Sequence, residues 1–443
     1  MMKYPMNYPK FPEMKNAEYQ IAEYARLKFE YGADRLAIQA LLDEAESQLA
    51  LIKERLLALP DDKTLAEKEP DDLAKIRLLR PNGPRQLWKS FDAKKYANRL
   101  KGAMLGRFAG CILGAPVEFW SVKDMVDWAA YIGDTFPPVD FWSDIKAPNN
   151  LRYDVSPCIN YTKKAMDCVP VDDDITYTIL GLLIAEDAGV NFTVEDVGKA
   201  WLKYLPYACT AEDIALKNLK AGIEAKKAAD IGNPFVQWIG ADIRSDPWGY
   251  LAPGLPEKAA EMAYQDAYIS HRRNGIYGEM YFSAVIAAAF AVDHVIDALR
   301  AGLNEIPQDC LLANDVKWAL EIGHTLNNHV DARKIAEARF GGMSGVHTNL
   351  NACLTIFGLM IGGDDFAKVI GETVAMGYDN DCTTATAGSI FGAVKGIDAI
   401  PARWYEPFNN KVLSYINGLP EFRIDDLLRR FTVQAAKVFD NRR

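Results

Sequence analysis

The 443-residue sequence lacks the features by which several protein classes are recognised. No run of about 18 uncharged apolar residues occurs, so a membrane-spanning helix is not expected. The seven cysteines are scattered without a Cys-x-x-Cys pair, and the five histidines show neither HExxH nor HxxxH spacing. These absences argue against a disulfide framework and against a histidine-rich zinc site, and they favour reduced thiols.

Basic charge is also scarce, because 50 Lys and Arg face 60 Asp and Glu and leave a net charge of −10. Nucleic-acid binding needs a basic face, so nucleic acid is not an expected partner. The first 14 residues, MMKYPMNYPKFPEM, contain no apolar core of a signal peptide. We therefore expect a cytoplasmic protein, with 49% hydrophobic residues available for a large core.

Few segments alternate polar and apolar residues, so the expected fold class is all-α, a compact multi-helix domain with an N-terminal helical extension. Residues 1–95 are interpreted as that extension, a helical hairpin over 17–59 broken at Gly32 and followed by a charged linker. It could be a packing arm that forms a homo-oligomer, or a lid over substrate. A second domain, rich in Gly and Ala, is expected over 96–443. Its expected helices include 176–188, 193–204, 211–229, 257–269, 278–302, 311–327 and 347–360, and the best strand candidate is 422–424.

Four glycines recur at every fourth position, namely Gly102, Gly106, Gly110 and Gly114. Helical geometry places them on one ridge, although each costs about 1 kcal/mol relative to alanine in a helix. We therefore expect another helix backbone to approach this ridge closely. Pro116 then ends the helix and leaves Glu118 on the turn that follows.

The first of two acidic clusters is Asp172-Asp173-Asp174, at the start of an apolar helical pattern. One aspartate there would be an ordinary N-cap, but three carboxylates in succession repel one another and favour a bound cation. Oxygen-only ligands suit Mg²⁺, Mn²⁺ or Ca²⁺ better than zinc or copper.

The second cluster, Asp379-Asn380-Asp381, precedes a small-residue helix expected over 383–395. We expect the cluster to be extended, so that Asp379 and Asp381 project on the same side. A DxD sequence by itself is also typical of a capping turn. Two such clusters, each leading into an apolar helix, together predict a carboxylate metal site.

Three segments together resemble the signature blocks of the ADP-ribosylglycohydrolase family, which includes the dinitrogenase reductase-activating glycohydrolases. They are KGAMLGRFAGCILGAPVEFW, VDDDITYTILGLL and GYDNDCTTATAGSIFGAVKG, in the family's order. The resemblance implies an all-α orthogonal bundle with two divalent cations, Mg²⁺ or Mn²⁺. It also implies a hydrolase (a glycosidase) acting on the N- or O-glycosidic bond of ADP-ribose, with the ions holding the ribose hydroxyls and the attacking water.

The family's site residues match particular positions of this sequence. Asp173 and Asp174 match the carboxylates of its TDDT motif, and Asp379 and Asp381 match those of its DxDT motif. Glu118 matches the acidic residue after the glycine-rich helix. The resemblance thus implies catalytic roles for Glu118 and Asp174, and metal ligands among Asp172, Asp173, Asp174, Asp379 and Asp381.

Three positions depart from the family's pattern. Asp172 and Ile175 stand where TDDT has threonines, and Cys382 replaces the threonine of DxDT. Asp172 is either a further ligand or only a helix cap. A thiol is a poor ligand for Mg²⁺, so Cys382 is expected to be a packed small side chain. The DDD and DNDC pattern resembles a divergent branch of the family.

Two polar segments are candidates to meet a substrate. The first, 270–280, supplies the predicted substrate-binding residues His271, Asn274, Tyr277 and Gly278. The second, 240–254, could pair with phosphate or stack on a base through Arg244, Trp248 and Tyr250. A structural turn with satisfied side chains is the alternative for both. His347 opens an expected helix and is predicted to cap it.

The expected function is the release of ADP-ribose from a protein side chain or a small acceptor. Two alternatives stay open: an N-ribosyl hydrolase of free nucleosides or nucleotides, and a non-catalytic descendant that acts as a structural or binding protein. A Mg²⁺ phosphohydrolase would use the same ligands but has no other supporting motif. A basic recess of diphosphate size beside the metals would favour ADP-ribose over nucleosides.

Overall fold

The computed structural model describes residues 15–440, in a chain that divides into two units after Glu67. The segment 1–14, in which no signal peptide is predicted, lies outside the described residues. Residues 68–95 share their contacts with the second unit. The catalytic-domain boundary expected near residue 95 stays a prediction.

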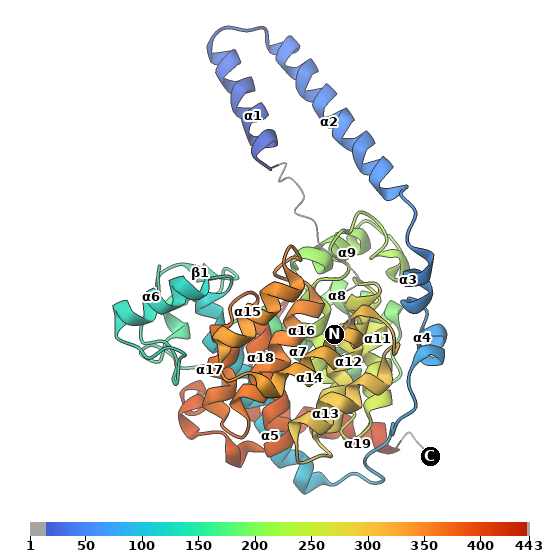
Figure 1. Cartoon of the computed structure of the whole chain (residues 1–443), viewed down its shortest axis with the longest axis vertical. Coiled ribbons are helices and arrows are strands. Elements are labelled where there is room, and N and C mark those ends of the chain that lie inside the picture. Colours follow the sequence, from blue (N-terminus) through green and yellow to red (C-terminus); the bar gives the residue numbers. More distant parts are fainter. Residues whose placement is uncertain (1–14, 441–443) are drawn as a thin grey trace. The chain divides into compact units, whose positions relative to one another are not determined.

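The first unit contains a helical hairpin formed by α1 (Lys15–Glu30) and α2 (Arg35–Leu57), drawn in blue in Figure 1. Gly32 adopts a positive φ of 82° in the turn, and the Asp34 carboxylate caps α2 by accepting from the backbone N–H of Ala37. No residue of α2 is fully buried, and apolar side chains such as Leu36 and Leu41 are exposed. The hairpin predicted over 17–59 is confirmed. The short α3 (Lys63–Lys68) spans the division between the units.

Helices dominate the second unit, and the all-α fold class is confirmed (Figure 1). None of the described helices is long and apolar enough to span a membrane. The helices are α4 (Leu73–Leu79), α5 (Ala93–Gly114), α6 (Val122–Ile132), α7 (Asp173–Ala188), α8 (Val194–Tyr204), α9 (Thr210–Lys220), α10 (Ser245–Leu251), α11 (Pro256–Ala267), α12 (Asn274–Ala289), α13 (Val295–Gly302), α14 (Leu311–Ile322), α15 (His329–Phe340), α16 (Thr348–Gly362), α17 (Phe366–Ala375), α18 (Asn380–Lys395) and α19 (Ile424–Asp440).

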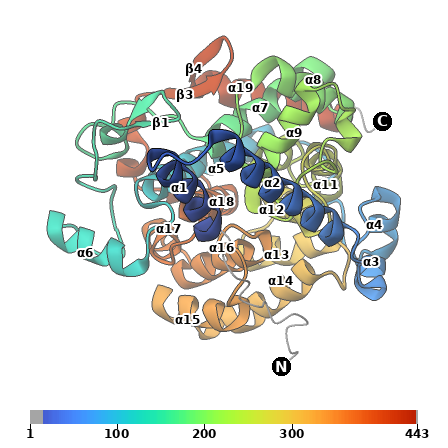
Figure 2. The same ribbon diagram turned by 90° about the horizontal axis from the view of Figure 1, so that it is seen from above.

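Two small antiparallel hairpins supply the strands of the described chain. One pairs β1 (Leu151–Arg152) with β2 (Ser156–Pro157), and the other pairs β3 (Lys411–Ile416) with β4 (Leu419–Arg423). Residues 422 and 423 of the strand expected at 422–424 end β4, whereas Ile424 begins α19. Figures 1 and 2 both show β1 and α6 on the same side of the second unit. The long connection between α6 and α7 therefore forms a distinct region that includes the β1–β2 hairpin.

The glycine ridge of α5 packs against α18 along its whole length. A methyl group added at Gly106 would lie 2.4 Å from the carbonyl oxygen of Gly388, and one at Gly110 would lie 2.2 Å from that of Thr384. Only residues without a side chain allow backbones to approach this closely. The close helix contact predicted from the glycine spacing is confirmed, and it joins the end of α5 to the start of α18.

Three local predictions are wrong. The helix expected over 278–302 is interrupted, since α12 ends at Ala289 and α13 begins at Val295. The helix expected over 211–229 ends at Lys220, and Gly222 follows with a φ of 84°. The second acidic cluster is not extended, because Asp381 already lies in the first turn of α18.

Candidate active site

The first acidic cluster begins α7, and its residues have different environments. Asp172 is the N-cap, and its Oδ1 accepts from the backbone N–H of Asp174 at 3.1 Å. Asp173 and Asp174 occupy the first turn, where the helix dipole stabilises negative charge. Asp172 therefore caps α7, while its other oxygen, Oδ2, accepts a hydrogen bond from Nε of Arg152 at 3.0 Å. Whether Asp172 is also a metal ligand stays a prediction.

The second cluster begins α18, and α5 ends beside it. Asp379 is the N-cap residue of α18 but makes no side-chain cap hydrogen bond. A methyl group at Gly114, the last residue of α5, would lie 2.4 Å from the Cα of Asp381. The turn after α5 carries Glu118 to the same place, as expected from Pro116. Close packing of the two helices thus sets the position of this cluster.

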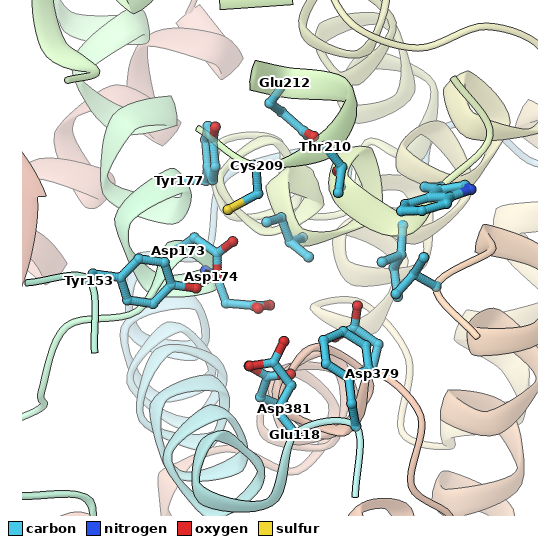
Figure 3. Close-up of a pocket in the computed structure, with 16 residues that line it drawn as sticks. Glu118, Tyr153, Asp173, Asp174, Tyr177, Cys209, Thr210, Glu212, Asp379 and Asp381 are labelled. Carbon is cyan, nitrogen blue, oxygen red and sulfur yellow. Dashed lines mark hydrogen bonds between the residues drawn. The ribbon is translucent and has the colours of Figure 1, made fainter. Parts of the chain in front are cut away.

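Two aspartates of each cluster and Glu118 line one cavity of about 280 Å³ (Figure 3). Asp173 and Asp174 lie on one side, and Glu118, Asp379 and Asp381 lie on the other. The cavity is also lined by Phe119, Tyr153, Tyr177, Cys209, Thr210, Glu212, Trp238, Ile239, Gly240, Ile243 and Val346. The structure therefore brings together acidic residues from three distant segments. Their roles as metal ligands and catalysts stay predictions.

Two groups of side chains are compact enough to hold a cation. One contains Glu118, Asp379 and Asp381, with one oxygen of each within 4.8 Å of the others. The other contains Asp172, Asp174 and Cys111. The sequence motifs did not indicate Cys111, because it lies inside the glycine-rich helix. Burial raises the pKa of the Cys111 thiol well above its usual range. That group therefore offers carboxylate oxygens rather than a thiolate.

Burial makes the carboxylates hard to ionise without a cation. Burial, followed by the negative charge of Asp381, raises the pKa of Glu118 to about 8. Burial likewise raises the pKa of Asp172 to about 8, although Arg152 opposes it, and raises the pKa of Asp379 well above its usual range. Divalent ions with oxygen ligands would reverse these shifts, so the residues present fit hard cations.

Arg107 compensates part of this charge from inside α5. It is fully buried, and its Nη1 lies 2.6 Å from Oδ2 of Asp246. Its Nη2 donates to Oδ1 of Asp174 at 3.1 Å. Although burial opposes ionisation, the two carboxylates raise the pKa of Arg107 above its usual range. Arg107 is therefore a permanent cation that orients Asp174.

Two further site residues come from the β1–β2 hairpin. Arg152 donates to Glu118, Asp172 and Asp381, and Tyr153 donates its hydroxyl hydrogen to Oδ1 of Asp173 at 2.6 Å. No motif marks either residue, because the segment between α6 and α7 has no regular periodicity. Their participation depends on contacts between residues that are distant in sequence.

The predicted substrate-binding residues of segment 270–280 do not line this cavity. His271, Asn274 and Tyr277 are fully buried. Asn274 donates to the Gln237 side chain and accepts from the backbone N–H of Leu312. The Tyr277 hydroxyl donates to the carbonyl oxygen of Pro70, and the His271 Nδ1 lies 2.8 Å from the Ser270 hydroxyl. These hydrogen bonds join segment 270–280 to other parts of the chain and so stabilise the fold.

Gly278 of the same segment faces a buried carboxylate, since a methyl group there would lie 2.0 Å from Oδ1 of Asp242. The lack of a side chain at Gly278 therefore makes room for Asp242. Substrate binding by His271, Asn274, Tyr277 and Gly278 stays a prediction.

Segment 240–254 is also internal. Arg244 is buried and pairs with Glu212 and Asp266, and Trp248 donates its indole hydrogen to Glu279 at 2.8 Å. The segment is not the turn expected as the alternative, since a 3-10 helix over Ile239–Arg244 leads into α10. Pairing with phosphate or stacking on a base by its side chains stays a prediction. His347 is the N-cap of α16, with Nδ1 accepting from the backbone N–H of Asn349, so its predicted capping role is confirmed.

Comparison with known proteins agrees with the geometry. The family model described as ADP-ribosylglycohydrolase matches residues 92–437. A solved structure titled "ADP-ribosylglycohydrolase-related protein complex" is similar in fold, with a TM-score of 0.53 and 17% identity over 78% of this chain and 99% of that one. No curated protein matches the sequence significantly. The family match covers most of the chain and includes both acidic clusters, and the chain therefore belongs to the ADP-ribosylglycohydrolase family.

Proposed function

We propose that this protein is a metal-dependent glycohydrolase that cleaves the bond between ADP-ribose and a protein side chain or a small acceptor. One observation carries the proposal: Asp173 and Asp174 face Glu118, Asp379 and Asp381 across a single cavity (Figure 3). Clustered buried carboxylates are costly in an inert scaffold, because each must be desolvated beside like charges. This cost argues against a purely structural descendant.

Two divalent ions, Mg²⁺ or Mn²⁺, would bind the ribose diol and lower the pKa of the attacking water. The Glu118–Asp379–Asp381 group would hold one ion, and carboxylates at the start of α7 would hold the other. All of these donors are oxygens, which hard cations prefer. The helix N-termini under both clusters stabilise the ionised carboxylates.

The protein's own groups would orient the reactants and move protons. Glu118 lies beside the cavity on the turn after α5, where its carboxyl can exchange a proton with a water or leaving group. Asp174 lines the same cavity and is held by Arg107 from behind. We propose these two residues as the catalytic pair, with Arg107 as a positioning residue.

The walls of the cavity suggest how the substrate binds. Tyr153, Tyr177 and Trp238 line it and can pack on a ribose or a base. Among the described residues, the lining contains no Lys or Arg that could pair with a diphosphate. This feature favours a second candidate function, hydrolysis of free nucleosides, whose ribose would use the same carboxylate centre.

Product analysis separates the two functions. The protein would be incubated with Mn²⁺ or Mg²⁺ and with ADP-ribosyl-arginine, ADP-ribosyl-serine or free nucleosides. The proposal requires that the wild-type protein releases ADP-ribose and that the Asp379→Asn variant does not. Asp364→Asn is the matched control, since the Asp364 side chain is 86% exposed and pairs with Lys395. Release of free base alone would favour nucleoside hydrolysis. If Asp379→Asn were as active as the wild type, this cavity would be excluded as the active site.

The exposed apolar residues of α1 and α2 support a further proposal about partners. Leu36, Leu41 and Leu57 are 77%, 67% and 76% exposed. A second copy of the chain could cover them by forming a helical bundle. Sedimentation of the full-length protein tests this, with Leu41→Lys expected to convert an oligomer to a monomer. A monomeric wild-type protein at micromolar concentration would rule it out.

A further inference from the structure

The guanidinium of Arg152 lies among carboxylates of both candidate metal groups. Its Nη1 donates to Oε2 of Glu118 and its Nη2 to Oδ2 of Asp381, both at 2.7 Å. Its Nε donates to Oδ2 of Asp172 at 3.0 Å. One side chain therefore joins the turn after α5, the start of α7 and the start of α18.

The β1–β2 hairpin holds this arginine in place. Tyr153 and Asp154, which follow it, both adopt a positive φ, 53° and 55°, which residues with side chains rarely do. The Tyr153 hydroxyl bonds to Asp173, and its ring stacks on Tyr207 with an interplanar angle of 12°. The cost of this backbone conformation is offset by contacts that aim Arg152 at the carboxylates.

The position of Arg152 affects one candidate metal group more than the other. In the Glu118–Asp379–Asp381 group, two of the three members already accept hydrogen bonds from Arg152. A divalent ion would need oxygens of the same carboxylates at about 2 Å, and the fixed positive charge nearby would repel it. In the other group, only Asp172 contacts Arg152, while Asp174 contacts Arg107.

We propose that Arg152 is a built-in cation that competes with a divalent ion for the Glu118–Asp379–Asp381 group. This inference rests on the metal centre of the proposed function, but it concerns metal affinity rather than the reaction. The ion that binds the Glu118–Asp379–Asp381 group is called the second ion. The wild-type protein binds it weakly, because Arg152 must first move away from Glu118 and Asp381. Binding of that ion is thereby coupled to displacement of the β1–β2 hairpin.

Calorimetric titration of the metal-stripped full-length protein with Mn²⁺ tests this competition without substrate. The Arg152→Gln variant should bind the second ion at least about tenfold more tightly than the wild type, because the charge-assisted hydrogen bonds of Arg152 to Glu118 and Asp381 no longer have to be broken. Arg429→Gln is the matched control, since Arg429 is exposed and pairs only with Asp426 in the described structure. It should leave both affinities unchanged.

A second variant covers the case in which Arg152→Gln does not fold without metal. Arg152→Lys keeps the charge but cannot span three carboxylates, so it should tighten the second site by a smaller factor and raise the melting temperature more on Mn²⁺ addition than the wild type does. Unchanged or weaker affinity in both variants, or no Mn²⁺ binding at all, overturns the inference. Tighter binding in a protein that hydrolyses no ADP-ribosyl compound would overturn the proposed function alone.

Discussion

The contact between α5 and α18 permits a test of how helix packing positions the proposed metal ligands. Gly102 and Gly114 lie on the same ridge, about 18 Å apart at the rise of an α-helix. A methyl group at Gly114 would lie 2.4 Å from the Cα of Asp381, and one at Gly102 would lie 2.6 Å from the carbonyl oxygen of Gly392. The two substitutions make similar clashes, but only the Gly114 clash involves a site residue.

The magnitude follows from the geometry. Ordinary contacts with a methyl carbon begin near 3.4 Å, so each substitution pushes the helices apart by about 1 Å. Overpacking costs up to about 3 kcal/mol where the clash is with backbone, which cannot rotate away. The higher helix propensity of alanine over glycine offsets about 1 kcal/mol of this cost. Gly102→Ala and Gly114→Ala should therefore each lower the free energy of unfolding by about 2 kcal/mol.

The two variants should differ in metal affinity. Gly114→Ala displaces Asp381 and should weaken Mn²⁺ binding at least about tenfold, whereas Gly102→Ala should leave it within about twofold. Urea denaturation followed by circular dichroism measures stability, and calorimetry measures affinity. Lys101→Ala, on the exposed face of α5, is the control and should change neither. Equal loss of metal affinity in both glycine variants, or none in Gly114→Ala, would refute the reasoning.

Three other predictions concern titration, buried charge and the thiol at the site. Burial lowers the pKa of His347 from 6.5 to about 4, so its contribution to stability is present above pH 6.5 and is lost as the pH falls toward 4. His347→Asn keeps a capping side chain without titrating, so its unfolding free energy should fall less over that range, by up to about 1.4 kcal/mol per pH unit. Arg107→Met leaves two buried carboxylates unpaired and should cost about 3–5 kcal/mol in urea denaturation; a loss below about 1 kcal/mol would show that Asp246 is not charged. Cys111→Ser should leave Mn²⁺ affinity within about twofold, because the buried thiol is neutral; a loss of tenfold would make it a ligand.

Local sequence patterns predicted much of this architecture because their causes are local. Glycines at every fourth position predicted the ridge that α18 contacts, and Pro116 predicted the end of α5. The aspartates of the first cluster predicted the start of α7, since carboxylates favour helix N-termini. Where the cause is tertiary, prediction failed. The continuous apolar pattern over 278–302 concealed the break between α12 and α13.

The burial of polar residues is likewise decided by tertiary packing. The sequence of segment 270–280 is polar enough for substrate binding. A polar side chain can form its hydrogen bonds with water at the surface or with other protein groups in the interior, and the sequence looks the same in both cases. Asn274 and Tyr277 are buried and bonded to Gln237 and Pro70. Only the packing of α12 against its neighbours decides which polar groups face the interior.

By itself, the sequence determined the family, the all-α class and the acidic residues that line the candidate site, because each depends on residue type and local spacing. Only the tertiary structure decided which basic side chains pair with buried carboxylates. Arg152 reaches Asp381 across 229 positions, and Arg107 reaches Asp246 through the core. Electrostatic pairing depends on distance in space, and no local pattern encodes the folded path that brings these side chains together.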